Sequence, residues 1–388
     1  MNNSKNNYHI LIISNGFPNY YNALDGIFYY DQALALKKNF PNAKIGFISV
    51  NPIGLRDFIK KPNLFKLGMN KYNRFGVNIY QFCYINIPII PNFDIKIANF
   101  LYPKLFKGYI KKFGLPQIIH VHAFEAGLAA ILIKQKYHIP FLITEHSSKF
   151  LNNKLSEVQQ AIAKQVFSES ALNIAVSSDF AKKLSVRFKL PFITIANLVK
   201  MDEFGPMHAE SKVYDLINIG AFNDNKNQIL ILKSLAKYKF GKVLLVGEGP
   251  NENKLKTYVK ENQLEHFVDF MPFKSRQELF SLIKKAHCLA VTSNHETFGV
   301  VAIEAMACGV PVISTRAGGP NDIVIENVNG YFMENNEDSF YEAFCKIKEN
   351  LSKFAAHKLV EYTNQHFSEN AIANKLLESY KNIIRLHG

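Results

Sequence analysis

The sequence lacks long hydrophobic runs and contains little cysteine. No apolar stretch reaches the roughly 18 residues of a bilayer-spanning helix, so we expect no membrane-spanning segment. Residues 1–8 are polar and lead directly into the apolar stretch 9–14 without the layout of a secretory signal, which favours a cytoplasmic location. The four cysteines have neither metal-binding nor redox spacing, so we expect buried thiols and no metal centre. They are Cys83, Cys288, Cys308 and Cys345.

Acidic residues are scarce in the first half of the chain only. Residues 1–198 carry 24 lysines and arginines against 9 aspartates and glutamates, whereas the rest of the chain carries 22 and 23. The net charge of +14 therefore belongs to the first half. Such a bias implies an anionic partner, which could be nucleic acid, an acidic membrane surface or a phosphate-bearing acceptor.

The length and the hydrophobic pattern predict two α/β domains. At 388 residues the chain exceeds the size at which one core usually stops growing. Strand-length apolar segments alternate with helical segments, which is typical of parallel sheets with helices on both faces. We therefore predict doubly wound, Rossmann-like domains at 1–205 and 206–367, followed by an amphipathic helix at 368–388 that Ser368 caps. The predicted strands are 9–14, 43–50, 118–122, 141–144, 173–176, 192–195, 216–219, 242–246, 268–270, 288–292 and 312–314.

Two glutamates eight residues apart mark the most informative segment of the chain. Glu296 falls in the predicted loop between the strand 288–292 and a helix that begins near Val300, and Glu304 lies just beyond the first turn of that helix. A helix N-terminus offers N–H groups and a positive dipole end, which suit a phosphate. A carboxylate one turn further along can accept hydrogen bonds from sugar hydroxyl groups, as an acidic residue does in dinucleotide sites.

The segment from Glu296 to Ile313 resembles the E-x7-E signature of the retaining glycosyltransferases of family 4, which have the GT-B fold. Phe298, Gly299, Ala305, Gly309 and Pro311 complete the resemblance. It implies two Rossmann-like domains that face each other across a cleft, with the acceptor in the first and a nucleotide-diphosphate sugar in the second. It also implies that the C-terminal helix packs back on the first domain, and that no metal or cofactor is needed beyond the UDP- or GDP-linked substrate.

The same resemblance assigns roles in the donor site. Glu296 is expected to meet the sugar hydroxyls and Glu304 the ribose. Lys226 keeps the lysine of the family's glycine–lysine loop and would contact the diphosphate, while Ala221 stands where many relatives have arginine; Arg316 and Lys274 are candidate substitutes. The remaining residues expected to contact or shape the donor site are Gly26, Gly220, Gly247, Met271, Phe298, Gly299 and Val300.

A histidine completes the predicted catalytic set of His146, Glu296 and Lys226. His146 follows the carboxyl end of the strand 141–144, where open α/β sheets place their ligands. By resemblance it lies under the donor sugar and helps to position or activate the reactants. His122 also ends a strand, and either a functional role or a strand-capping role fits it.

Basic and aromatic residues are interleaved in the stretches 56–75 and 95–113. This composition suits the surface of an anionic bilayer, although a buried helix face with a solvated basic edge fits it equally well. We therefore expect a cytoplasmic protein that is peripheral on the inner face of the membrane.

The function that these observations favour is that of a retaining hexosyltransferase. It would move a sugar to a saccharide or lipid-linked acceptor in the synthesis of a surface polysaccharide. Alternatives are a nucleotide-sugar epimerase-like enzyme on the same fold, and a non-enzymatic basic binding protein. A dinucleotide-dependent oxidoreductase would need a Gly-x-Gly-x-x-Gly turn after the first strand, which residues 14–19 do not supply. Nucleic acid is not expected as a partner, because no recognition motif accompanies the basic charge.

Overall fold

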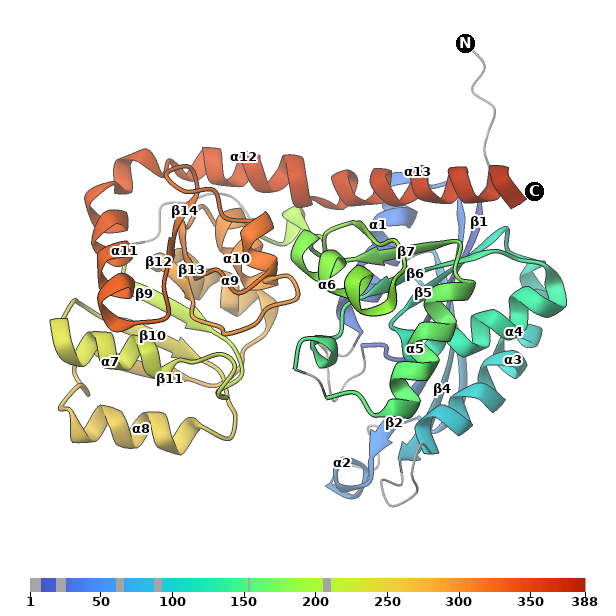
Figure 1. Cartoon of the computed structure of the whole chain (residues 1–388), viewed down its shortest axis with the longest axis horizontal. Helices are drawn as coiled ribbons and strands as arrows, with labels where there is room; N and C mark the ends of the chain where they lie inside the picture. The colour runs from blue at the N-terminus through green and yellow to red at the C-terminus, as the bar shows by residue number, and fades with distance from the viewer. Residues whose placement is uncertain are drawn as a thin grey trace, which may run out of the picture. The chain divides into compact units, whose positions relative to one another are not determined.

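The chain folds into two compact α/β units. In the computed structural model the described residues are 8–18, 26–60, 66–86, 93–152, 154–204 and 211–387. The N-terminal domain comprises Met1–Val176, Ala181–Leu198 and Ile372–Gly388, and the C-terminal domain comprises Ser177–Phe180 and Val199–Ala371. Both contain a largely parallel sheet with helices packed against it (Figure 1), which confirms the prediction of two Rossmann-like domains.

The sheet of the N-terminal domain has the order β3-β4-β2-β1-β5-β6-β7-β8 among the described residues. All neighbouring strands are parallel except β3 and β4. The central strand β1 reads as a continuous apolar run because both faces of a parallel sheet are covered. The strands are β1 (His9–Ser14), β2 (Lys44–Gly54), β3 (Gly68–Arg74), β4 (Val77–Asn86), β5 (Ile118–His122), β6 (Phe141–Glu145), β7 (Leu172–Ala175) and β8 (Ile193–Thr194). The helices are α1 (Ile27–Asn39), α2 (Leu55–Lys60), α3 (Phe93–Phe113), α4 (Gly127–Tyr137), α5 (Glu157–Glu169), α6 (Ser178–Phe188) and α13 (Glu369–His387).

The C-terminal domain has the all-parallel order β11-β10-β9-β12-β13-β14 among the described residues. The chain builds outward from β9 in one direction and from β12 in the other, so the two strands flank the point where the strand order reverses. The strands are β9 (Tyr214–Ile219), β10 (Val243–Val246), β11 (Val268–Met271), β12 (Ala286–Val291), β13 (Val312–Thr315) and β14 (Gly330–Met333). The helices are α7 (Ile229–Tyr238), α8 (Glu252–Glu261), α9 (Arg276–Lys284), α10 (Val300–Ala307), α11 (Glu337–Glu349) and α12 (Ala356–Phe367).

Three features differ from the sequence-based prediction. The β3–β4 hairpin and β14 were not predicted, and the hairpin occupies part of the stretch 56–75 that we interpreted as a membrane-surface segment; residues 61–65 of that stretch lie outside the described residues. The division between the domains lies at Leu198 and Val199, before the predicted boundary at residue 205. Val199 N–H donates to the Phe367 carbonyl at 2.8 Å, which joins Val199 to the C-terminal domain.

The C-terminal helix α13 belongs to the core of the N-terminal domain. Its apolar side chains share a buried cluster with β1, β2 and α1. Ser368 caps the helix, since its hydroxyl accepts a hydrogen bond from the Ala371 N–H at 3.3 Å. The buried residues of α13 are Ile372, Ala373, Leu376, Leu377, Tyr380 and Ile383. The last segment of the chain therefore completes the first domain.

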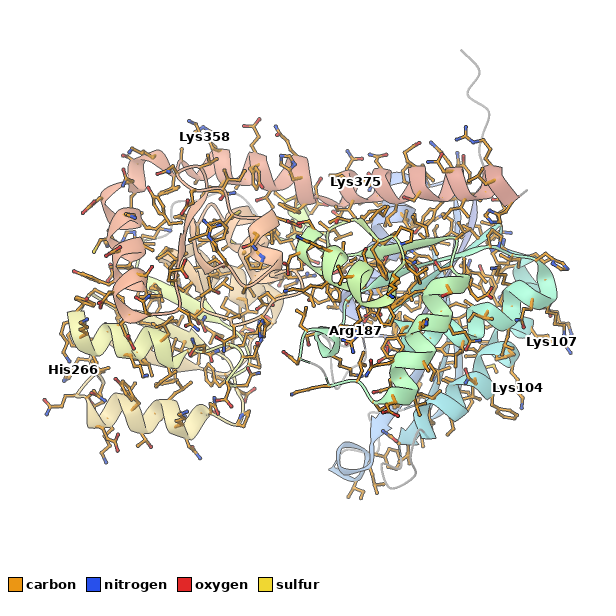
Figure 2. All side chains as sticks on the ribbon, viewed as in Figure 1. Lys104, Lys107, Arg187, His266, Lys358 and Lys375 are labelled. Carbon is orange, nitrogen blue, oxygen red and sulfur yellow. The ribbon has the colours of Figure 1, made fainter. Side chains whose placement is uncertain are left out.

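Replacing Leu376 by alanine should destabilise the N-terminal domain by about 2–5 kcal/mol, because the side chain is 1% exposed and its removal leaves a cavity. The matched control is Lys375→Ala on the same helix (Figure 2), whose side chain is exposed, and it should change stability by less than about 0.5 kcal/mol. Chemical unfolding followed by circular dichroism measures both. Equal midpoints for the two variants would show that α13 is not part of the folded core.

Candidate functional site

The predicted donor residues gather at the switch point of the C-terminal sheet. Gly220 directly follows β9, Gly247 follows β10 and Met271 ends β11, and these strands are neighbours in register. The Gly220 N–H donates to Val246 O at 3.0 Å, and the Gly247 N–H donates to Met271 O at 2.9 Å. A Cβ at Gly247 would lie 2.0 Å from the Gly220 carbonyl oxygen, so only glycine permits this close approach of two loops. The carboxyl ends of parallel sheets are where open α/β folds bind ligands.

Lys226 and Glu296 form an ion pair that joins the loops after β9 and β12. The Lys226 ammonium contacts Glu296 Oε1, and the Ser293 hydroxyl donates to the same oxygen at 2.8 Å. The Thr292 hydroxyl also donates to the Lys226 carbonyl at 2.7 Å. The two charged side chains are 27% and 12% exposed, so the pair is accessible but well held. Two residues that were predicted from separate motifs are thus in direct contact.

The backbone of Glu296 is anchored from the other side by the loop after β13. The Glu296 N–H donates to Ala317 O at 2.8 Å, and its carbonyl accepts from the Gly319 N–H at 2.9 Å. This clamp fixes the loop that leads into α10. The Glu296 side chain is therefore held by its backbone, by Lys226 and by Ser293.

Helix α10 begins at Val300, as predicted. Gly299 precedes it with φ of 101°, a left-handed conformation that favours glycine, and the first N–H groups of a helix have no partners within the helix. Phe298 is 2% exposed and its ring packs at 5.9 Å from Phe367. Contact between Phe298 and a ligand would therefore come through its backbone, not through its ring.

Arg276 approaches Glu304, which sequence reasoning did not foresee. Its Nε lies 3.4 Å from Glu304 Oε1, and its guanidinium also lies 3.4 Å from Glu203 Oε2. Arg316, by contrast, stacks 4.0 Å over the Phe332 ring, and Lys274 is exposed. The sequence could have indicated Arg276 through its position, because it is the first residue of α9, directly after the Ser275 cap and five residues after the end of β11. The carboxylate predicted to bind ribose is thus oriented by a cation from a neighbouring helix.

His146 and Gly26 belong to the N-terminal domain. His146 directly follows β6, and its Nε2 shares a hydrogen bond of 3.1 Å with Nδ1 of His122, which ends β5. The Tyr29 ring stacks on His122 with centroids 4.8 Å apart. Gly26 precedes α1 with φ of 63°, and a Cβ there would lie 2.5 Å from the Gly16 carbonyl oxygen. The carboxyl edge of this sheet therefore carries a compact aromatic and histidine cluster.

Burial keeps these histidines neutral. It lowers the pKa of His146 to about 3, against a smaller opposing effect of Asn197, and it also holds the pKa of His122 well below the usual 6.5. Glu145, next to His146, is fully buried and accepts N–H hydrogen bonds from Phe124, His146 and Ser147 at 2.8–3.1 Å. Burial and the Glu125 carboxylate raise the pKa of Glu145 to about 8, although the three N–H groups act in the opposite direction.

The described residues offer neither a metal site of clustered ligands nor a membrane-spanning helix. They contain no group of three or more histidine, cysteine, aspartate or glutamate side chains arranged to hold a metal ion. None of their helices has both the length and the apolar composition needed to cross a bilayer.

The predicted site residues therefore fall into two groups. Gly220, Lys226, Gly247 and Met271 lie with Glu296, Phe298, Gly299, Val300 and Glu304 at the carboxyl edge of the C-terminal sheet. Gly26 and His146 lie at the carboxyl edge of the N-terminal sheet, together with His122 and Tyr29, which join the cluster through contacts that spacing alone does not reveal.

Comparison with known proteins identifies the family. Residues 69–202 match the model described as Glycosyltransferase Family 4, and residues 202–366 match that of Glycosyl transferases group 1. An uncharacterized glycosyltransferase of Methanocaldococcus jannaschii is 28% identical over 339 residues, which cover 87% of this chain and 94% of the relative.

Solved structures share the fold at low identity. Sucrose-phosphate synthase from Thermosynechococcus elongatus superposes with a TM-score of 0.77 at 20% identity, covering 98% of this chain and 100% of that one. HepE of Anabaena in complex with UDP-glucose gives 0.67 at 17% identity, covering 96% and 99%. The chain therefore belongs to the family 4 glycosyltransferases, with the two Rossmann-like domains of the GT-B fold.

Proposed function

We propose that the protein is a retaining hexosyltransferase that uses a UDP- or GDP-linked sugar. The acceptor would be a saccharide or a lipid-linked precursor of a surface polysaccharide. The observation that carries the proposal is the Lys226–Glu296 pair beside the start of α10, at the switch point of a parallel sheet. This arrangement brings a cation, a helix N-terminus and a carboxylate together where a nucleotide-diphosphate sugar would bind.

Lys226 and the start of α10 would act on the leaving group. Negative charge builds up on the diphosphate as its bond to the sugar breaks. A fixed ammonium and the positive end of a helix stabilise that charge without reorganising during the reaction. Because Lys226 also contacts Glu296, donor binding would divide the ammonium between a carboxylate and a phosphate.

The two glutamates would recognise different parts of the donor. Glu296 would accept hydrogen bonds from the sugar hydroxyls, since its carboxylate is held in place by Lys226 and Ser293. Glu304 would accept hydrogen bonds from ribose, and Arg276 would keep its carboxylate oriented. Charge-assisted hydrogen bonds of this kind are among the stronger ones in proteins.

One structural relative supports the donor class, because HepE of Anabaena is known in complex with UDP-glucose. The acceptor and the location rest on the charge of this chain. With 24 basic and 9 acidic residues in 1–198, the first domain would hold an acidic or lipid-linked acceptor, and the protein would be peripheral on the cytoplasmic face of the membrane.

Glu304→Ala should weaken donor binding about tenfold or more, because ribose hydroxyls would lose a charged acceptor worth about 1.5–3 kcal/mol. The donor is first identified by thermal protection with a panel of UDP- and GDP-sugars, and its affinity is then measured by calorimetry. Glu203→Ala is the matched control, since it also removes a carboxylate from Arg276 but should leave donor affinity about unchanged. Unchanged donor binding in Glu304→Ala would remove this residue from the site. If the wild-type protein converts the nucleotide sugar into its epimer and transfers no sugar to an acceptor, this product would favour the epimerase-like alternative.

Lys226→Ala should lower both donor affinity and turnover, since the diphosphate is charged before the reaction and gains charge during it. The decisive comparison is made in a Glu296→Gln background. If Lys226 contacts the diphosphate, Lys226→Ala should still weaken donor binding in the Glu296→Gln background. If Lys226 serves only to hold Glu296, its removal should have no further effect on donor binding in that background, and the assignment fails. Lys233→Ala on α7, a lysine that is 50% exposed, is the control and should behave as wild type.

His146→Ala should lower turnover more than donor affinity, as expected of a residue that acts in the transfer step. Because burial lowers the pKa of His146 to about 3, the ring is charged only below that value. The rate should therefore show no ionisation of His146 over roughly pH 5 to 8. His266→Ala, an exposed histidine of the C-terminal domain (Figure 2), is the control. Wild-type turnover in His146→Ala would exclude the assigned role.

A further inference from the structure

A pocket of about 540 Å³ opens on the helical layer of the N-terminal domain, between α3 and α4. This volume is within the range of small-molecule pockets, about 300–1,000 Å³. Its lining comes from two short segments, 103–107 and 132–137. The lining residues are Pro103, Lys104, Phe106, Lys107, Leu132, Ile133, Gln135, Lys136 and Tyr137.

The interior of the pocket is apolar. Phe106 and Ile133 are 1% and 2% exposed and are the most buried of its lining residues, and the Tyr137 ring packs with its centroid 5.2 Å from that of Phe106. Leu132 is 47% exposed and presents further apolar surface to solvent. Apart from the lysines and the Tyr137 hydroxyl, Gln135 is the only polar side chain among the lining residues. A sugar would need many more hydrogen-bonding partners than this, so the pocket suits a hydrocarbon.

The rim of the pocket is basic. Lys104, Lys107 and Lys136 line it, and the lining includes no acidic residue. Lys104 and Lys107 lie three residues apart on α3, so they share one face of the helix, and both are exposed (Figure 2). Lys134, the neighbouring lysine of α4, is instead paired with Glu169 at 3.0 Å. The pocket therefore combines an apolar interior with a positive rim whose lining residues include no acid.

The pocket is separate from the histidine cluster of the same domain. Helix α4 follows the carboxyl end of β5 and leads back to the amino end of β6, so its last turns, at 132–137, lie toward the amino ends of the strands. His122 and His146 lie at the opposite, carboxyl edge. A ligand in the pocket would not occupy the place of the reacting groups.

We propose that this pocket binds one acyl chain of an anionic phospholipid, whose phosphate contacts Lys104, Lys107 and Lys136. The inference rests on the proposed attachment to an anionic membrane, for which it specifies the lipid-binding site. A hydrocarbon chain with an anionic head matches both the apolar interior and the basic rim. The stretch 95–113, which lies entirely within α3, would thus bind lipid through a defined cavity in addition to general surface charge.

The first test compares two matched pairs of substitutions on α3 in binding to vesicles of phosphatidylglycerol and phosphatidylcholine at low salt. Lys104→Glu with Lys107→Glu removes pocket charges, whereas Lys111→Glu with Lys112→Glu makes the same charge change outside the pocket. Lysines near an anionic surface contribute about fivefold each, so the pocket pair should lose at least about thirty-fold. The control pair should lose clearly less, because its lysines do not line the pocket and would not contact the bound phosphate. Wild-type binding should weaken as salt rises and be poor on phosphatidylcholine alone. All four side chains are exposed, so folding should be preserved, which circular dichroism checks.

The second test reports on the acyl chain itself. The protein contains no tryptophan, so Tyr137→Trp places a single fluorescent reporter in the pocket wall. Phosphatidylglycerol brominated near the end of its acyl chain should quench this reporter strongly. A reporter at Phe113→Trp, at the end of α3 and outside the pocket, should be quenched much less.

The outcomes separate the two proposals. A larger loss in the pocket pair together with selective quenching supports the lipid pocket. The wild type could bind the anionic vesicles while both variant pairs lose equal affinity, or while both reporters are quenched equally. Either result would overturn the proposed lipid pocket and leave the proposed membrane attachment standing. A wild type that does not bind the anionic vesicles at low salt overturns both, while donor binding and sugar transfer, measured separately, remain an independent test of the enzyme.

Discussion

The ion pair between Lys226 and Glu296 is the contact on which the organisation of the candidate donor site depends. It ties the loop after β9 to the loop after β12, and these two strands flank the point where the order of the sheet reverses. At that point the loops of adjacent strands turn to opposite faces of the sheet and leave space between them. A lysine and a carboxylate that bridge the two loops hold both in place and concentrate charge where a phosphate and a sugar would lie.

The backbone around this pair is as constrained as the side chains. Gly247 approaches the Gly220 carbonyl too closely for any side chain, and the left-handed Gly299 starts α10 directly after the loop that carries Glu296. Cross-loop hydrogen bonds to Ala317 and Gly319 hold Glu296 from the other side. The site is therefore built mainly from rigid loop geometry, which reduces the reorganisation that a charged ligand would require.

The N-terminal domain separates its chemical features in space. Neutral histidines lie at the carboxyl edge of its sheet, His122 buried and His146 partly buried, and desolvation keeps their pKa values low. The basic and partly apolar surface belongs to α3 and α4 in the helical layer, and its pocket lies toward the amino ends of the strands. The N-terminal domain thus carries two chemically different surfaces toward opposite edges of its sheet.

The sequence by itself determined the strand–loop–helix segment that contains Glu296, Gly299 and Glu304, and most of the parallel strands, because these features follow from local apolar patterns and from glycine conformation. It did not reveal the β3–β4 hairpin, whose edge strand is largely exposed and carries no clear apolar alternation. It also did not show that Lys226 meets Glu296, 70 residues away, that Arg276 meets Glu304, or that His122 meets His146. Strand order and sheet register decide these pairings, and both arise only when segments distant in sequence pack together.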